Sequence, residues 1–244
     1  MENVIESPDL VDGTGLTKYT ELIGKHDGET AFVFGAGTSL YKKNLSFVKD
    51  YVSITTNSGI LLFNWSKGDK DNRYWVTNDS MVREWTYWET VKNSSSNKII
   101  RTSWLKYRDQ IPDDFYVFWP RKTEPDVIDE NEEGLSYCSS TPSCVDLAIQ
   151  MGCKKIFLVG VDHYFLGERR YFWEYRPRRE WPRRINKPRP GFVEQRYVFG
   201  INQGAFSALN IFAESKGCKI YNVGKRSKVT AFEKIDFEDI GKYL

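Results

Sequence analysis

The sequence is poor in the residues that mark metal sites and disulfide frameworks. Its 244 residues include four cysteines and two histidines. No two cysteines form a CxxC pair, and their spacing suits neither a zinc site nor a dense set of disulfides. We therefore expect reduced thiols in or near the core of a cytoplasmic protein.

Long apolar runs, repeats and a strong net charge are also missing. No run approaches the roughly 18 apolar residues that span a membrane, and the first residues, MENVIESPDL, carry acids and no apolar h-region. We expect no membrane span and no signal peptide. The net charge of +2 gives the whole molecule no electrostatic preference for a partner. The length fits one large domain, which we assign to residues 1–244.

Short β-branched and aromatic runs alternate with helical patterns along the chain. Such alternation of continuous apolar strands with helices predicts an α/β, Rossmann-like, doubly wound and mostly parallel sheet. Two helices are expected, at 141–151 and 202–216, each followed by a glycine. The expected strands are 30–35, 51–57, 73–79, 97–103, 114–120, 154–160 and 218–224.

Ligands of such sheets bind beyond the carboxyl ends of the strands, where FVFGAGTSL places a glycine-rich turn. Gly35 and Gly37 would let the backbone approach a ligand, and a helix beginning near Ser39 would offer N–H groups to a phosphate. The GxGxxG pattern is incomplete, because Leu40 stands in place of the third glycine. The alternative is an ordinary strand-to-helix turn capped by Thr38 or Ser39.

Polar residues end other strands and begin the first helix. Asn57 and Asn78 could read a base edge or a sugar hydroxyl, or simply form turns. Asp79 could hold a metal or act as a base, or be a solvated turn residue. Ser140 lies among hydroxyls that either cap the helix or bind a phosphate.

The run VGVDHYF follows the most apolar strand. We expect Asp162 to be exposed at the cleft, where it could grip a ribose hydroxyl, a metal or an acceptor. His163 should alternate away from it, so that at most one of the two faces the site. His26 lies in GKHDG, which is typical of a surface turn without a chemical role.

Residues 168–196 form a basic and aromatic segment with ten basic and four acidic residues, a local charge of +6. Four prolines argue against a helix, so we expect a long loop inserted over 168–199. It could be a solvated or oligomer-contact loop, a lid over a phosphate-bearing substrate, or a surface for nucleic acid. We assign its lid and acceptor contacts to Arg169, Arg170, Arg176, Arg178 and Arg179.

The block CSSTPSCVDLAIQMGCKKIFLVGVDHYFLGERRY resembles the bacterial lipooligosaccharide sialyltransferases that use CMP-activated sialic acid. More distantly, the chain resembles the 6-hydroxymethylpterin diphosphokinases. The likeness runs as separated motifs from Phe32 to about Phe232. It implies that Ser140, Asn57 and Asn78 contact the donor nucleotide. It also implies that Asp162 matches the family's aspartate, and that Tyr164 and Tyr171 hydrogen-bond the departing phosphate.

The sequence departs from this family at two positions. Ala36 replaces an asparagine of the glycine turn, which removes a possible donor contact. The family's catalytic-base histidine follows the lid, where this chain has Gly200. The candidates that could replace it are Asp162, His163, Asp79 and Glu194.

The leading hypothesis is a glycosyltransferase that uses a nucleotide-sugar, such as a CMP-sugar, and an acceptor glycan or other hydroxyl. The resemblance to the sialyltransferases implies that no metal or other cofactor is required. Catalysis is assigned to Tyr164, Tyr171, Asp162 and His163, and donor binding to Gly35, Gly37, Ser39, Asn57, Asn78 and Ser140. One alternative is a Mg²⁺-dependent pterin-type diphosphokinase with Asp79 or Asp162 as the metal ligand. Another is a nucleic-acid-binding or nucleic-acid-modifying protein that uses the arginine-rich loop. We also expect a homo-oligomer.

Overall fold

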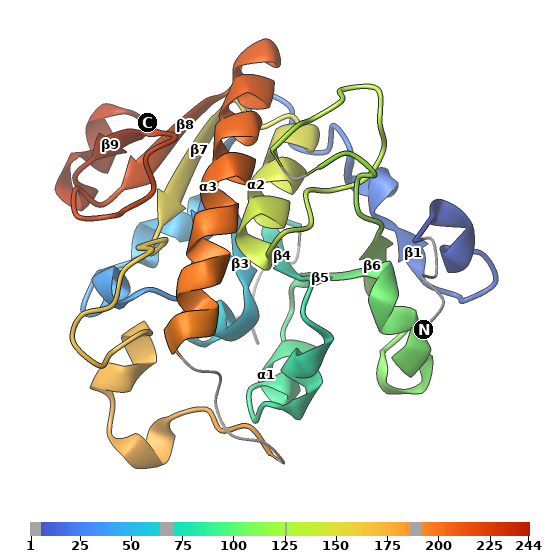
Figure 1. Ribbon diagram of the computed structural model, residues 1–244, viewed down its shortest axis with the longest axis horizontal. Helices are drawn as coiled ribbons and strands as arrows, with labels where there is room; N and C mark the ends of the chain where they lie inside the picture. Colours follow the sequence, from blue (N-terminus) through green and yellow to red (C-terminus); the bar gives the residue numbers. More distant parts are fainter. Residues whose placement is uncertain (1–5, 64–70, 125, 186–191) are drawn as a thin grey trace.

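A nine-stranded parallel sheet organises the computed structural model, which describes residues 6–63, 71–124, 126–185 and 192–244 (Figure 1). The α-helices of these residues are α1 (Trp88–Lys92), α2 (Ser140–Gln150) and α3 (Phe192–Ser215). The strands are β1 (Thr17–Lys18), β2 (Thr30–Phe34), β3 (Val52–Thr56), β4 (Arg73–Thr77), β5 (Asn97–Arg101), β6 (Phe115–Phe118), β7 (Lys155–Val159), β8 (Lys219–Val223) and β9 (Glu233–Ile235).

The order of the strands reverses in the middle of the sheet. The spatial order is β1-β6-β5-β4-β3-β2-β7-β8-β9, and each pair of neighbouring strands runs parallel. From β2 the chain builds outward to β6 on one side, and from β7 it builds outward to β9 on the other. The reversal therefore falls between β2 and β7. Their pairing ends at Phe34 and Val159. Parallel sheets bind ligands at such a switch point.

Alternating side chains sort the core onto the two faces of the sheet. Ala31 and Val33 belong to the cluster that packs under α2 and α3, whereas Phe32 and Phe34 belong to a cluster on the opposite face. Figure 1 shows α2 and α3 side by side across one face. The opposite cluster is rich in aromatic rings, with Phe32 stacked on Phe157 at 5.0 Å between centroids.

The predicted fold class is confirmed, and the seven predicted strands are present with shifts of one or two residues at their ends. The short strands β1 and β9 and the helix α1 were not predicted. Helix α3 begins at Phe192, ten residues before its predicted start, so the expected loop boundary at 199 is wrong. The four prolines of the segment all precede this helix, which removes the reason for extending the loop so far.

The basic segment before α3 is attached to the glycine-rich turn after β2 and to the loop before α1. We call residues 168–185 the lid segment; residues 186–191 and the side chain of Glu194 lie outside the described residues. The lid segment contains two 3₁₀ helices, Phe172–Tyr175 and Arg178–Glu180. Its Phe172 N–H donates to the Ala36 carbonyl at 3.0 Å. In Figure 1 it lies near the end of the molecule where α3 begins.

A buried ion pair holds α2 against the chain that leads to it. Arg121 donates to both carboxylate oxygens of Asp146, at 3.2 Å each, and both side chains are almost fully buried. The same carboxylate accepts from the Ser136 N–H at 2.7 Å. These bonds fix the approach of the chain to the first turn of α2.

No helix of the described residues has the length and apolarity needed to cross a membrane.

Candidate active site

A cleft of about 560 Å³ lies at the switch point of the sheet. Residues that follow β2, β3, β4 and β7 form its floor and walls, together with the start of α2, the lid segment and the first half of α3. The predicted residues that line it are Gly35, Gly37, Asn57, Asn78, Asp79, Ser140, Asp162, His163, Tyr164, Arg170 and Tyr171.

The glycine-rich turn packs against the end of β7. The Gly35 N–H donates to the Val159 carbonyl at 2.9 Å, and the Gly37 N–H to the Gly160 carbonyl at 2.8 Å. A Cβ on Gly37 would lie 2.4 Å from an Asp162 carboxylate oxygen, so only glycine fits there. The helix expected after the turn is only a 3₁₀ turn, Thr38–Leu40, and is too short to form a helix N-terminal phosphate site.

Asp162 is buried, not exposed as predicted. The residue is 6% exposed, and its carboxylate accepts hydrogen bonds from the Ser39 N–H at 2.9 Å, the Ser39 hydroxyl at 2.5 Å and the Thr38 hydroxyl at 3.3 Å. Burial raises the pKa of this carboxyl, and the bonds from Ser39 and Thr38 oppose that rise. Asp162 therefore joins the two loops at the switch point, and Ser39 turns toward it instead of lining the cleft.

His163 also lines the cleft, so the prediction that at most one of Asp162 and His163 would do so is wrong. β7 ends at Val159, and the backbone of His163 has a left-handed φ of 52°, which breaks the alternation of a strand. The imidazole stacks on Phe199 at 4.6 Å between centroids, and its Nε2 lies 3.4 Å from the Asn202 amide nitrogen. Burial lowers the pKa of His163 to about 4, so the ring is neutral at pH 7.

The two asparagines and Ser140 have different surroundings. Asn57 adopts a left-handed φ of 49°, and its Oδ1 accepts from the Thr77 hydroxyl at 2.7 Å. The Asn78 side chain donates to the Tyr137 carbonyl and accepts from the Ser143 hydroxyl, while its N–H donates to Ser140 Oγ at 2.9 Å. The Asn78 amide is thus used within the protein, whereas no partner is recorded for the Asn57 amide nitrogen in the described part of the chain.

Phenols line the cleft on its lid side. Tyr171 stacks on Trp173 at 5.0 Å, and the Trp173 indole N–H donates to the Ser58 hydroxyl at 3.1 Å. Burial, and next the Asp162 carboxylate, raise the pKa of Tyr164. Burial also raises the pKa of Tyr87 well above its usual value, with smaller contributions from Asp79 and Tyr171. Tyr164 and Tyr87 are therefore protonated hydrogen-bond donors at neutral pH.

Of the predicted lid arginines, only Arg170 lines the cleft, and this residue is 9% exposed. The others lie outside the lining, where aromatic rings of the lid hold three of their guanidinium groups. Arg169 lies 4.5 Å from the Tyr175 centroid, Arg176 lies 5.6 Å from Phe172, and Arg178 lies 6.0 Å from Trp181. Arg179 is exposed.

Asp79 lies in the cleft beside backbone donors. Its Oδ1 accepts from the Met81 N–H at 2.8 Å. Asp79 is exposed, but desolvation by the cleft walls raises the pKa of its carboxyl, and the Met81 bond opposes that rise. In the described ranges, no group of three or more His, Cys, Asp and Glu side chains gathers as a set of metal ligands.

Several cleft residues were not predicted. Aromatic spacing in REWTYWET could have indicated Trp85 and Tyr87, which line the cleft from the loop before α1. Arg101 follows from the end of β5, where Glu6 accepts from its guanidinium Nε at 2.9 Å. Asn202 was read only as the start of a helix, and no local pattern marks it as part of a site.

His26 lies in a turn as predicted, but its side chain is buried. Its Nε2 lies 2.6 Å from the Tyr74 hydroxyl, and its Nδ1 lies 3.2 Å from a Glu29 carboxylate oxygen. The residue therefore has a packing role away from the cleft lining.

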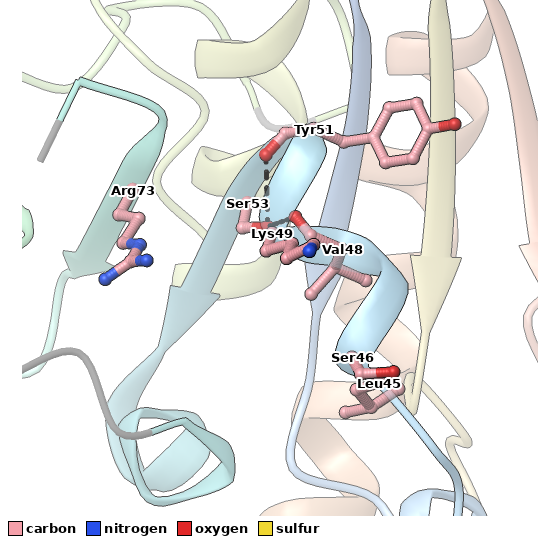
Figure 2. Close-up of a pocket in the computed structure, with 7 residues that line it drawn as sticks. All are labelled: Leu45, Ser46, Val48, Lys49, Tyr51, Ser53 and Arg73. Atoms are coloured by element: carbon pink, nitrogen blue, oxygen red, sulfur yellow. Dashed lines mark hydrogen bonds between the residues drawn. The ribbon is translucent and has the colours of Figure 1, made fainter. Parts of the chain in front are cut away.

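A second cavity of about 150 Å³ lies at the amino ends of β3 and β4 (Figure 2). Figure 2 shows Ser53 with its hydroxyl directed to the Val48 and Tyr51 carbonyls, at 3.2 and 3.4 Å. It holds Lys49 and Arg73 but no acid, histidine or cysteine. The larger cleft is therefore the candidate active site.

Comparison with known proteins shows the fold. No family model matches the sequence, and no curated protein matches it. The structure is similar to the MAf glycosyltransferase from Magnetospirillum magneticum AMB-1, with a TM-score of 0.53 and 13% identity over 93% of this chain. This chain spans only 38% of that protein. It is also similar to the sialyltransferase CstII from Campylobacter jejuni, solved with CMP-3FNeuAc, with a TM-score of 0.44 and 14% identity over 85% of this chain and 86% of that one.

Proposed function

We propose that this protein transfers a sugar from a nucleotide-sugar donor to a hydroxyl acceptor. The observation that carries the proposal is the cleft at the switch point, which gathers phenols, a neutral imidazole and Arg170 around the glycine-rich turn. The nucleotide would lie against Gly35, Gly37, Asn57 and Ser140. The fold shared with the MAf glycosyltransferase supports a transferase of this kind.

The leaving group in this reaction is a nucleotide phosphate. The bond between the anomeric carbon and the phosphate oxygen breaks, and negative charge develops on that oxygen. Tyr164 and Tyr171 would donate hydrogen bonds to it, and Arg170 would supply positive charge. Fixed donors of this kind stabilise the developing charge without a metal.

His163 is the residue that would accept the proton of the acceptor hydroxyl. Its ring stacks on Phe199, which is the neighbour of Gly200, where the resembling family would have its base. In this chain the imidazole in that region of the cleft would therefore belong to His163, after β7. In the resembling family it would belong to a histidine at the position of Gly200, in α3. The ring is neutral at pH 7, as a base must be, because burial lowers its pKa to about 4. A pKa this far below neutral makes the imidazole a weak base, so the role assigned to His163 rests on the position of its ring in the cleft.

The diphosphokinase alternative needs a carboxylate that is free to bind Mg²⁺. Both carboxylate oxygens of Asp162 accept bonds from Ser39, which leaves Asp79 as the main candidate. We favour glycosyl transfer, which the fold shared with the MAf glycosyltransferase supports. Nucleic-acid binding or modification by the arginine-rich loop stays a prediction.

A thermal-shift series with CMP, UDP, GDP and ATP, each with and without Mg²⁺, tests the donor class. A nucleotide that binds the folded state stabilises it, by about 2.7 kcal/mol at a concentration of 100 times its Kd, and therefore raises the melting temperature. We expect one nucleotide to raise the melting temperature by the same amount with Mg²⁺ and with EDTA in its place. A shift that appears only with Mg²⁺ would favour the diphosphokinase.

Replacing the phenols tests the chemistry. We expect Tyr164→Phe with Tyr171→Phe to lower donor turnover by about 10²-fold or more, because the developing charge loses its donors. Nucleotide-induced thermal shifts should change little. Tyr41→Phe is the matched control, since Tyr41 stacks on Tyr175 outside the cleft lining. Unchanged donor turnover in the double variant would contradict the mechanism.

A further inference from the structure

A short chain of hydrogen bonds connects the segment before α2, helix α3 and His163. The Asn202 Oδ1 accepts from the Ser139 hydroxyl at 2.9 Å and from the Cys138 thiol at 3.5 Å. Asn202 is 4% exposed, so its amide is held in place. The Ser139 hydroxyl can donate or accept, so the thiol decides the orientation: as a poor acceptor, it favours the amide oxygen toward Cys138.

This orientation directs the amide nitrogen of Asn202 toward His163. The Asn202 Nδ2 lies 3.4 Å from the imidazole Nε2. An amide N–H beside a ring nitrogen is favourable only when that nitrogen carries a lone pair. A proton on Nε2 would place two donors against each other.

We propose that Asn202 is a positioning residue that fixes His163 in the Nδ1–H tautomer and leaves Nε2 unprotonated at the cleft. Ser139 and Cys138 act through it, because they hold the amide in the orientation that this tautomer requires. The second nitrogen of a histidine is often set in this way by the partner of the first.

The surroundings of the ring agree with a neutral imidazole, whose buried Nδ1 has no hydrogen-bond partner among the described residues. From α3, the rings of Phe199 and Phe206 pack on it, at 4.6 and 5.6 Å between centroids. The nearest acid in the sequence, Asp162, is bonded to Thr38 and Ser39, and burial raises the pKa of the Cys138 thiol to about 11. Burial accounts for the lowered pKa of His163, and no carboxylate is recorded as a partner of its ring in the described residues.

The consequence for chemistry rests on the proposed function. An acceptor hydroxyl that reached Nε2 would meet a lone pair, and the long contact with Asn202 would give way to the stronger hydroxyl bond. The proton would then move from the hydroxyl oxygen to Nε2 as the new glycosidic bond forms. The tautomer itself can be measured without any activity.

Nitrogen-15 NMR of the imidazoles tests the assignment directly, because the chain has only two histidines. In the wild-type protein at pH 7 we expect His163 to show a protonated Nδ1 and an unprotonated Nε2. His26, whose Nε2 contacts the Tyr74 hydroxyl, serves as an internal reference. A wild-type His163 with its proton on Nε2 would overturn the proposal.

Variants of Asn202 provide the second measurement. Asn202→Asp places a carboxylate beside Nε2 and should raise the pKa of His163 by about 1–3 units, with a proton on Nε2. Asn202→Leu removes the amide, so resonances of the Nε2–H form should appear. Asn210→Asp makes the same change elsewhere on α3, where Asn210 bonds to Glu214, and should leave His163 unaffected. An unchanged pKa and tautomer in both Asn202 variants would contradict the role of Asn202.

The two proposals fail in different ways. If the NMR result holds and no nucleotide-sugar is turned over, the tautomer assignment stands and the proposed function is wrong. If transfer occurs with His163 in the Nε2–H form, the function stands and the positioning role of Asn202 is wrong.

Discussion

At the scale of single residues, His163 couples the cleft to pH. Its pKa is lowered from 6.5 in the unfolded chain to about 4 in the fold, because burial penalises the imidazolium. Between these values the unfolded chain binds a proton that the folded chain does not bind. The stabilising contribution of the neutral ring is therefore complete above about pH 6.5 and is lost as the pH falls toward 4.

We expect the free energy of unfolding to fall more steeply between pH 6.5 and 4 in the wild-type protein than in His163→Gln. The difference between the two should reach roughly 2–3 kcal/mol, since one pKa unit corresponds to about 1.4 kcal/mol. Urea unfolding at several pH values measures it. Carboxyl groups with shifted pKa values, such as Asp79, contribute equally to both proteins and cancel. Parallel curves would show that His163 is not held neutral by the fold.

Asp162 shows how a residue can be in the right place with an unexpected role. Its position after β7 brings it to the switch point, as predicted, but its carboxylate joins the two loops there. The close packing of Gly37 against it leaves no room for a side chain. The preference for glycine at this position is thus a packing requirement, whether or not a phosphate binds.

At the scale of elements, the lid segment is attached to the loop before α1 like a short antiparallel ladder. The Thr86 N–H donates to the Arg183 carbonyl at 2.9 Å, and the Ile185 N–H donates to the Glu84 carbonyl at 2.7 Å. The Arg184 Nε lies 2.9 Å from a Glu84 carboxylate oxygen, and both side chains are largely shielded from solvent. This attachment places Trp85 and the lid on the same side of the cleft.

We expect Glu84→Ala to loosen this attachment, because Arg184 loses an ion-pair partner next to the backbone bonds. Trypsin should cleave the native protein faster after Arg183 and Arg184, by about fivefold if the pair contributes about 1 kcal/mol. A bound nucleotide should reduce the difference. Glu130→Ala is the matched control, because the Glu130–Lys216 pair is exposed and lies elsewhere. Equal cleavage rates in the two variants would contradict a role for Glu84 in holding the lid.

At the scale of the whole molecule, the cleft joins parts of the chain that are far apart in sequence. Its lining includes Gly35 after β2, Asn78 after β4, Ser140 at the start of α2 and Asn202 in α3. A ligand in the cleft would therefore contact both halves of the sheet and the lid. Its binding should stabilise all of these segments together.

We expect hydrogen–deuterium exchange of the nucleotide-bound protein to slow over the turn at 35–40, the start of α2 and residues 160–175 at the same time. Exchange at the amino ends of β3 and β4, near the cavity of Figure 2, should change less. The comparison uses the nucleotide that gives the largest thermal shift. Protection confined to residues 45–53 and 73 would place the binding site in the smaller cavity.

The sequence alone determined the α/β class, the seven principal strands, α2, and the cluster of polar residues after β2, β3, β4 and β7. These follow from local periodicity and from the rule that parallel strands end at one edge of the sheet. Tertiary structure decided what each side chain contacts. Asp162 accepts a hydrogen bond from Ser39, and Arg169 and Arg176 lie over aromatic rings. Asn202 contacts His163, which is 39 residues away in the sequence. Such contacts depend on how separate segments pack, which no pattern within one segment records.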